Sequence, residues 1–153
     1  MIWNDKLGYY CVNDLCQIDL MLLKQNHVKL LIFDIRGTII VGKQINQFFL
    51  DLIKQIKQLG CFQVLFATNN CAYYTHKIAN LLATINFNAS YLYFACKPFL
   101  FRMQNAIKKM QLNNLMINHS FKIAIIGDQL NTDGKLAKKM HATLIYLNKN
   151  WDK

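Results

Sequence analysis

The sequence contains no glutamate: its eight acidic residues are all aspartate, and they face 18 lysines and arginines, for a formal charge of +10. Arginine is also scarce, since only Arg36 and Arg102 are present. Any site that needs carboxylates must therefore draw on a short list of positions. They are Asp5, Asp14, Asp19, Asp34, Asp51, Asp128, Asp133 and Asp152.

Several other absences limit the class of protein. One proline, no linker-like stretch and no internal repeat indicate a single domain over residues 1–153. No stretch of about 18 residues is free of Lys, Asp, Asn or Gln, which argues against a membrane-spanning helix. The start of the chain lacks the basic and apolar regions of a secretory signal. We therefore expect a cytoplasmic globular protein.

Short apolar runs alternate with segments of helical periodicity. The runs have the length and composition of buried parallel strands, and they lie at 29–34, 62–67, 91–94, 122–127 and 143–147. Apolar residues at helical spacing lie between them, over about 45–59 (ending at Gly60), 73–84 and 99–111. This alternation predicts an α/β fold with a Rossmann-like, doubly wound parallel sheet of about five strands, after an ill-defined lead-in segment, 1–26.

Polar residues follow the ends of four predicted strands. In chain order they are Asp34, then Thr68 with Asn69, then Lys97, and then Asp128 with Asp133. Ligands of open parallel sheets bind beyond the carboxyl ends of the strands, so we expect these side chains on one rim. Each alone also fits an ordinary role, such as a helix N-cap or a solvated lysine. Their coincidence favours a functional site.

These residue types suit phosphoryl chemistry. An aspartate at a strand end can attack phosphorus as a nucleophile, and a second one nearby can share Mg²⁺ with it through hard oxygen ligands. The Thr68 hydroxyl and the N–H groups that follow it can hold phosphoryl oxygens. Lys97 can neutralise the charge that spreads over those oxygens. The pattern predicts a phosphorylated substrate and Mg²⁺ as cofactor.

The order Asp34, Thr68, Lys97 and Gly127-Asp-Gln-Leu-Asn-Thr-Asp133 resembles the four motifs of the haloacid dehalogenase (HAD) superfamily of aspartyl-phosphate phosphatases. Within it, the chain is most similar to the YqeG-like subclass IIIA proteins, whose mitochondrial relatives are phosphatidylglycerophosphate phosphatases. Ile18-Asp-Leu20 and Ala95-Cys-Lys97-Pro98 add to that similarity, which spans about 12–147.

The resemblance implies roles for individual residues. The catalytic ones are Asp34 (nucleophile), Arg36, Thr68, Lys97 and Asp133. The phosphate-binding ones are Thr68, Asn69 and Lys97, and the Mg²⁺ ligands are Asp34, Asp128 and the backbone carbonyl of Arg36.

The connections 34–68 and 68–97 are too short for the cap domain that such enzymes commonly insert there. A HAD-like, capless domain has an open rim, which suits a large substrate such as a lipid head group, phosphatidylglycerophosphate included.

Arg36 departs from the family pattern, which has a second aspartate at this position as general acid and base. Guanidinium has no proton to exchange at neutral pH. Three outcomes stay open: a slow phosphatase in which Arg36 turns away to solvent or to an acidic neighbour, a catalytically impaired phosphate-binding protein, or an enzyme for leaving groups of low pKa. Positioned acid–base catalysis is typically worth roughly 10²–10⁴-fold, so we expect a loss of that order on ordinary phosphomonoesters.

The charge of +10 offers a rival function, a basic module that binds nucleic acid or an anionic membrane. Its lysines are scattered along the chain and no aromatic-plus-basic RNA-binding motif is present, so nucleic acid is the less favoured partner. Peripheral contact with an anionic membrane stays open. The sequence does not indicate an oligomeric state.

Overall fold

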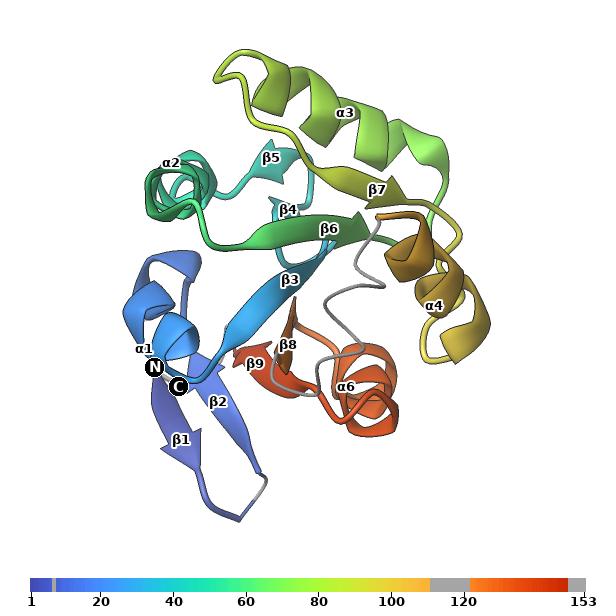
Figure 1. Cartoon of the computed structure of the whole chain (residues 1–153). Coiled ribbons are helices and arrows are strands. Elements are labelled where there is room, and N and C mark those ends of the chain that lie inside the picture. Colours follow the sequence, from blue (N-terminus) through green and yellow to red (C-terminus); the bar gives the residue numbers. More distant parts are fainter. Residues whose placement is uncertain (7, 111–121, 149–153) are drawn as a thin grey trace.

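A seven-stranded, mostly parallel sheet forms the centre of the computed structural model, which describes residues 1–6, 8–110 and 122–148 (Figure 1). The strand order is β1-β2-β9-β8-β3-β6-β7, and only β1 and β2 pair antiparallel. The strands are β1 (Ile2–Asn4), β2 (Tyr9–Val12), β3 (Val28–Asp34), β6 (Gln63–Ala67), β7 (Ser90–Leu92), β8 (Lys122–Gly127) and β9 (Thr143–Leu147). The predicted α/β class, with a mostly parallel sheet, is confirmed.

The sheet is wider than the five predicted strands because the segment 1–26, expected to be an ill-defined lead-in, contributes β1 and β2. Strand β2 runs parallel to β9, with Tyr10 opposite Ile145. A 3-10 turn, Leu15–Gln17, and helix α1 (Leu20–Gln25) complete this segment. Strands of three and four residues are too short for a periodic pattern to show in the sequence. Their place in the fold is set by pairing with β9, at the far end of the chain.

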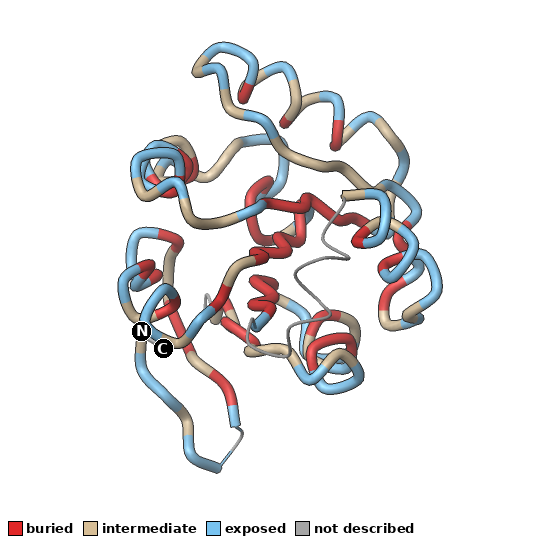
Figure 2. Tube along the Cα trace, viewed as in Figure 1, coloured by how far each residue is buried: buried red, intermediate tan, exposed pale blue. Residues whose placement is uncertain are grey.

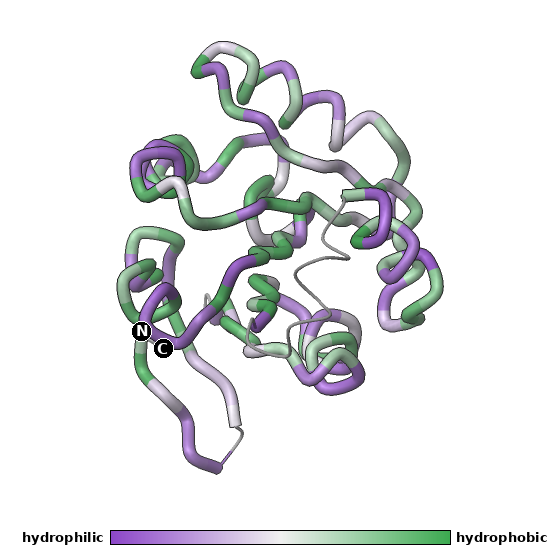
Figure 3. The backbone as a smooth tube through the Cα atoms, in the orientation of Figure 1, coloured by the Kyte–Doolittle hydropathy of each residue, from purple (hydrophilic) through white to green (hydrophobic). Residues whose placement is uncertain are grey.

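Helices cover both faces of the sheet. Helices α1, α2 (Phe49–Leu59) and α3 (Ala72–Ala83) pack on one face, and α4 (Leu100–Lys109) and α6 (Lys135–Lys139) on the other. Side chains of β3 alternate between the two cores, because successive residues of a strand point to opposite faces: Leu31 and Phe33 join the first core, Leu30 and Ile32 the second. Past their first one or two residues, β3, β6 and β8 are accordingly buried and mostly apolar (Figures 2 and 3).

Two helix boundaries differ from the sequence prediction. The helix expected over 45–59 begins at Phe49, because Ile45 belongs to a two-stranded sheet of β4 (Ile40–Val41) and β5 (Gln44–Ile45). Its predicted end is confirmed: Gly60 adopts a left-handed conformation, with φ of 59°. Helix α4 ends at Lys109, and residue 111, the last of the third predicted helix, lies outside the described residues.

The strand order creates a crevice at the carboxyl edge of the sheet. From β3 the chain proceeds to β6 and β7 on one side, and then crosses to β8 and β9 on the other. The loops that leave β3 and β8 therefore diverge, which is the position at which open α/β sheets bind ligands. A π-helical turn, η2 (Leu130–Gly134), follows β8 at this point. No helix in the described part of the chain is long and apolar enough to cross a membrane.

Candidate functional site

Five of the predicted site residues gather at this carboxyl edge. Asp34 is the last residue of β3, Thr68 follows β6 directly, and Asp128 follows β8 directly. Asp133 lies in η2, and Lys97 lies in the loop between β7 and α4. All but Asp128 are buried in the structure, which is uncommon for charged side chains without a specific role.

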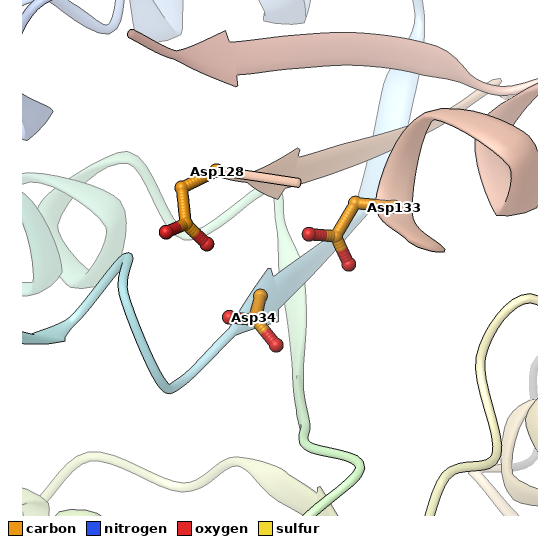
Figure 4. A group of neighbouring side chains, drawn as sticks. All are labelled: Asp34, Asp128 and Asp133. Atoms are coloured by element: carbon orange, nitrogen blue, oxygen red, sulfur yellow. The ribbon is translucent and has the colours of Figure 1, made fainter. Parts of the chain in front are cut away.

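Three carboxylates face one another in the crevice. Asp34, Asp128 and Asp133 each offer an oxygen, and these oxygens all lie within 4.8 Å of one another (Figure 4). The three side chains come from β3, from the residue after β8 and from η2 (Figure 4). Hard divalent cations bind carboxylate oxygens in such a grouping. This set of residues could therefore hold a metal ion.

Lys97 bridges two of the carboxylates. Its Nζ donates to Asp34 Oδ1 at 2.5 Å and to Asp133 Oδ1 at 2.6 Å. The Lys97 side chain is only 3% exposed, so the ion pairs form away from water, where removal of one partner leaves an uncompensated buried charge. Three carboxylates against one ammonium group leave the site with a negative balance. It is suited to a further cation or to a shared proton.

The site shifts the pKa values of its own groups. Burial raises the pKa of Asp34 to about 7, and repulsion by Asp133 and Asp128 adds to the rise, although the charge of Lys97 opposes it. Burial likewise raises the pKa of Asp133, again against the influence of Lys97. Burial alone would lower the pKa of Lys97, but Asp34 and Asp133 more than offset it, so the ammonium stays charged.

Two glycines allow the carboxylates to approach the backbone. A Cβ at Gly37 would overlap the carboxylate of Asp128, and a Cβ at Gly127 would overlap that of Asp133. Gly37 also has φ of +89°, a conformation that side chains with a Cβ rarely adopt. Both positions therefore need glycine for the crevice to close around the acidic groups.

Thr68 is fully buried and fixed by its backbone. Its N–H donates to Leu92 O at 2.9 Å, and its carbonyl accepts from Ala95 N at 2.9 Å. Its hydroxyl oxygen accepts from the backbone N–H of Asn70 at 3.2 Å and from the Asn70 side-chain amide at 3.4 Å. Because the hydroxyl acts as acceptor in both contacts, its own proton can be donated to a phosphoryl oxygen.

Asn69 binds the backbone of Lys97 on both sides. Its Oδ1 accepts from Lys97 N at 2.7 Å, and its Nδ2 donates to Lys97 O at 3.1 Å. The side-chain amide of Asn69 is thus engaged in positioning Lys97. The phosphate-binding role expected for Asn69 stays a prediction, and it would fall to the backbone N–H.

The loop that carries Lys97 has a strained backbone. Phe94 and Cys96 both have positive φ, 47° and 56°. Positive φ at residues other than glycine costs of order 1–3 kcal/mol each and persists only where the surroundings enforce it. The hydrogen bonds from Asn69 are part of that enforcement.

Arg36 turns away from the carboxylates. Its side chain is exposed, Nη1 donates to Asn70 Oδ1 at 3.4 Å, and its Cζ lies 5.8 Å from the centre of the Tyr74 ring. Of the orientations left open by the sequence, the structure shows the outward one, with a neutral amide and an aromatic ring as neighbours instead of an acidic residue.

Two residues of the site were missed by reasoning from the sequence. Thr38 is fully buried, and its Oγ1 lies 3.4 Å from Asp128 Oδ1. Asn70 connects Arg36 to Thr68 through its amide. A signal was present for both, because Thr38 follows Asp34 within the same short turn and Asn70 follows Thr68 and Asn69 at a strand end.

Comparison of the chain with family models, with curated proteins and with solved structures gives no match.

Proposed function

We propose that the chain is a HAD-type, Mg²⁺-dependent phosphatase that hydrolyses a phosphomonoester through a phosphoaspartate on Asp34. The observation that carries this proposal is the junction in which buried Lys97 binds both Asp34 and Asp133 beside Asp128, at the crevice of a parallel sheet. A buried aspartate, a buried lysine and further carboxylates at such a crevice are the groups that phosphoryl transfer needs.

The residues present fit Mg²⁺. Asp34 and Asp128 supply carboxylate oxygens from opposite sides of the crevice, and the backbone carbonyl of Arg36 is the third ligand that we propose. Oxygen ligands of this kind, completed by water, are those that Mg²⁺ prefers. When bound, the ion would supply positive charge that holds a phosphate against the acidic groups.

The reaction that we propose begins with Asp34. One of its carboxylate oxygens forms a bond to phosphorus as the bond from phosphorus to the leaving oxygen breaks. Lys97 and Thr68 donate hydrogen bonds to the phosphoryl oxygens, and Asp133 holds Lys97 in place. Water then attacks the phosphorus of the phosphoaspartate, which releases phosphate and restores Asp34. The leaving oxygen takes its proton from solvent, because Arg36 has none to give.

The substrate that we propose is a phosphomonoester with a large or membrane-borne remainder, such as a lipid head group. The connection 34–68 contains only β4, β5, α2 and β6, and the connection 68–97 contains only α3 and β7. Neither forms a separate cap, which supports an open rim and a substrate larger than a free metabolite.

A second candidate is a phosphate-binding protein without turnover. The exposed orientation of Arg36 favours it, since no general acid stands at that position. Both candidates need the same anion and metal site. They differ only in whether the phosphoaspartate forms and is hydrolysed.

Phosphate release from p-nitrophenyl phosphate, with Mg²⁺ and with a chelator in its place, tests the proposal. We expect slow release by the wild-type protein, its loss with chelator, and its loss in Asp34→Asn. Asp51→Asn, which removes an exposed carboxylate on α2, is the matched control and should keep wild-type activity. Equal activity of wild type and Asp34→Asn would exclude Asp34 as nucleophile. Phosphate binding without release in the wild type would favour the second candidate.

A further inference from the structure

Arg36 carries a positive charge that no carboxylate neutralises within the described residues. The ion pairs of these residues join Lys54 to Asp51 and Lys97 to Asp34 and Asp133, and none includes Arg36. Guanidinium has five N–H donors, and the one hydrogen bond that Arg36 makes within the described residues goes to the neutral amide of Asn70. Most of its donors therefore face solvent at the rim of the crevice.

The guanidinium is nevertheless held in place. Asn70 binds it at 3.4 Å, and the ring of Tyr74, near the start of α3, lies 5.8 Å from its central carbon, within the range of a cation–π contact. The backbone is fixed as well: Arg36 pairs with Ile40 in an isolated β-bridge, and Gly37 N donates to Ile40 O at 2.8 Å. A pre-positioned cation loses less side-chain entropy when it binds an anion.

The position of Arg36 relates it to the phosphoryl group. Along the chain it stands two residues after Asp34, and it is linked through Asn70 to the Thr68 hydroxyl, which follows the neighbouring strand β6. Lys97 already serves the buried end of the site, where it binds Asp34 and Asp133. An exposed cation at this position would meet the part of a substrate that lies beyond the reacting phosphoryl group.

We propose that Arg36 binds a second anionic group of the substrate, so that the site takes phosphomonoesters that carry another phosphate or a carboxylate near the reacting phosphate. This inference rests on the proposed function, since it assumes that Asp34, Thr68 and Lys97 receive the first phosphate. It also accounts for an arginine in a chain that otherwise uses lysine almost throughout: guanidinium binds phosphate and carboxylate oxygens through two parallel hydrogen bonds.

Equilibrium binding in the presence of Mg²⁺ tests the inference without requiring turnover. The probes are inorganic phosphate, propanediol monophosphate, propanediol bisphosphate, and the pair glycerol 3-phosphate and 3-phosphoglycerate, which differ by a carboxylate. The proteins are wild type, Arg36→Gln and Arg102→Gln. Arg102 is the matched control, because it is the other arginine and is also exposed, with its Nη2 bound to Tyr93 O.

We expect the wild-type protein to bind propanediol bisphosphate at least about tenfold more tightly than propanediol monophosphate, because a charge-assisted pair of hydrogen bonds contributes that much to affinity. Arg36→Gln should lose that preference, and Arg102→Gln should keep it. A gain with 3-phosphoglycerate as well would show that a carboxylate serves, and a gain with bisphosphate alone that a second phosphate is needed. Equal affinity of wild type for bisphosphate and monophosphate, with phosphate still bound, would overturn this inference alone. No binding of inorganic phosphate to any of the proteins would overturn the proposed function together with it.

Discussion

Asn69 and Lys97 are joined by two hydrogen bonds, from the Lys97 N–H to the amide oxygen of Asn69 and from the amide nitrogen to the Lys97 carbonyl. One side chain thus pairs both backbone groups of Lys97 and continues the backbone hydrogen bonds that Phe94 N and Ala95 N donate to the loop after β6. The same backbone segment carries the Lys97 ammonium into contact with Asp34 and Asp133. The loop after β6 therefore sets the position of the charge on which the acidic site depends.

Asn69→Ala should destabilise the protein by about 1–3 kcal/mol, because it leaves a partly buried N–H and carbonyl of Lys97 without partners. Urea unfolding measures the change. Asn105→Ala, at an exposed position of α4, is the control and should change the free energy of unfolding by less than about 0.5 kcal/mol. A similar small change for Asn69→Ala would show that Lys97 does not depend on this amide.

Lys97→Met should cost about 3–5 kcal/mol at pH 8, because it leaves Asp34 and Asp133 buried beside each other without the cation. The cost should be smaller at pH 5, because burial raises the pKa of Asp34 to about 7 and this carboxyl group is then protonated. Lys54→Met removes an exposed ion pair with Asp51 and should cost no more than about 1 kcal/mol at either pH. Unfolding by guanidinium chloride at the two pH values measures these changes in the free energy of unfolding. If Lys97→Met lost the same free energy at both pH values, the ion pairs of Lys97 with Asp34 and Asp133 would not be the cause.

The central part of the fold could be predicted because its strands are continuous apolar runs. Strands β3, β6, β8 and β9 match the predicted runs to within one residue at each end. The remainder depends on contacts distant in sequence or on elements too short to show a period. Strands β1 and β2 exist through pairing with β9, and α6 has only five residues. The first residue of a predicted helix, Ile45, likewise belongs to β5 because it pairs with Ile40 of β4.

The candidate site, too, could be predicted from the sequence only in part. That Asp34, Lys97, Asp128 and Asp133 meet follows from their positions after the ends of parallel strands, which the sequence reveals. The orientation of each side chain depends on neighbours that no local pattern identifies. Arg36 turns outward because Asn70 and Tyr74 receive it.

The free energy of unfolding should fall as the pH rises and Asp34 loses its proton. Burial raises the pKa of Asp34 from 3.8 to about 7, so the folded chain binds this proton more tightly than the unfolded chain does. Protonation therefore stabilises the fold, and the contribution is lost between about pH 4 and pH 7. Lys97 does not oppose the trend, because its pKa is raised and its stabilising charge persists throughout this window.

In metal-free buffer, the melting temperature of wild type should drop by about 5 °C or more between pH 5 and pH 8 as a result. Asp34→Asn should show a smaller drop, with the remainder due to Asp133, whose pKa is also raised. Asp51→Asn, at an exposed carboxylate, should follow the wild type. Equal pH dependence of wild type and Asp34→Asn would refute the raised pKa of Asp34.

The position of Arg36 predicts how activity depends on the leaving group. Arg36→Asp places a carboxyl group where the proposed reaction lacks a proton donor, and general acid catalysis is worth roughly 10²–10⁴-fold. Phosphate release from an alkyl phosphate should rise by that order, because an alkoxide leaves poorly without a proton. The rise with p-nitrophenyl phosphate should be much smaller, since its leaving group is stable as an anion. Arg36→Asn, which removes the cation without supplying a proton, should give neither gain. If Arg36→Asn matched Arg36→Asp on the alkyl phosphate, the gain would come from removing the positive charge, and the lack of a general acid would not be what limits the wild type.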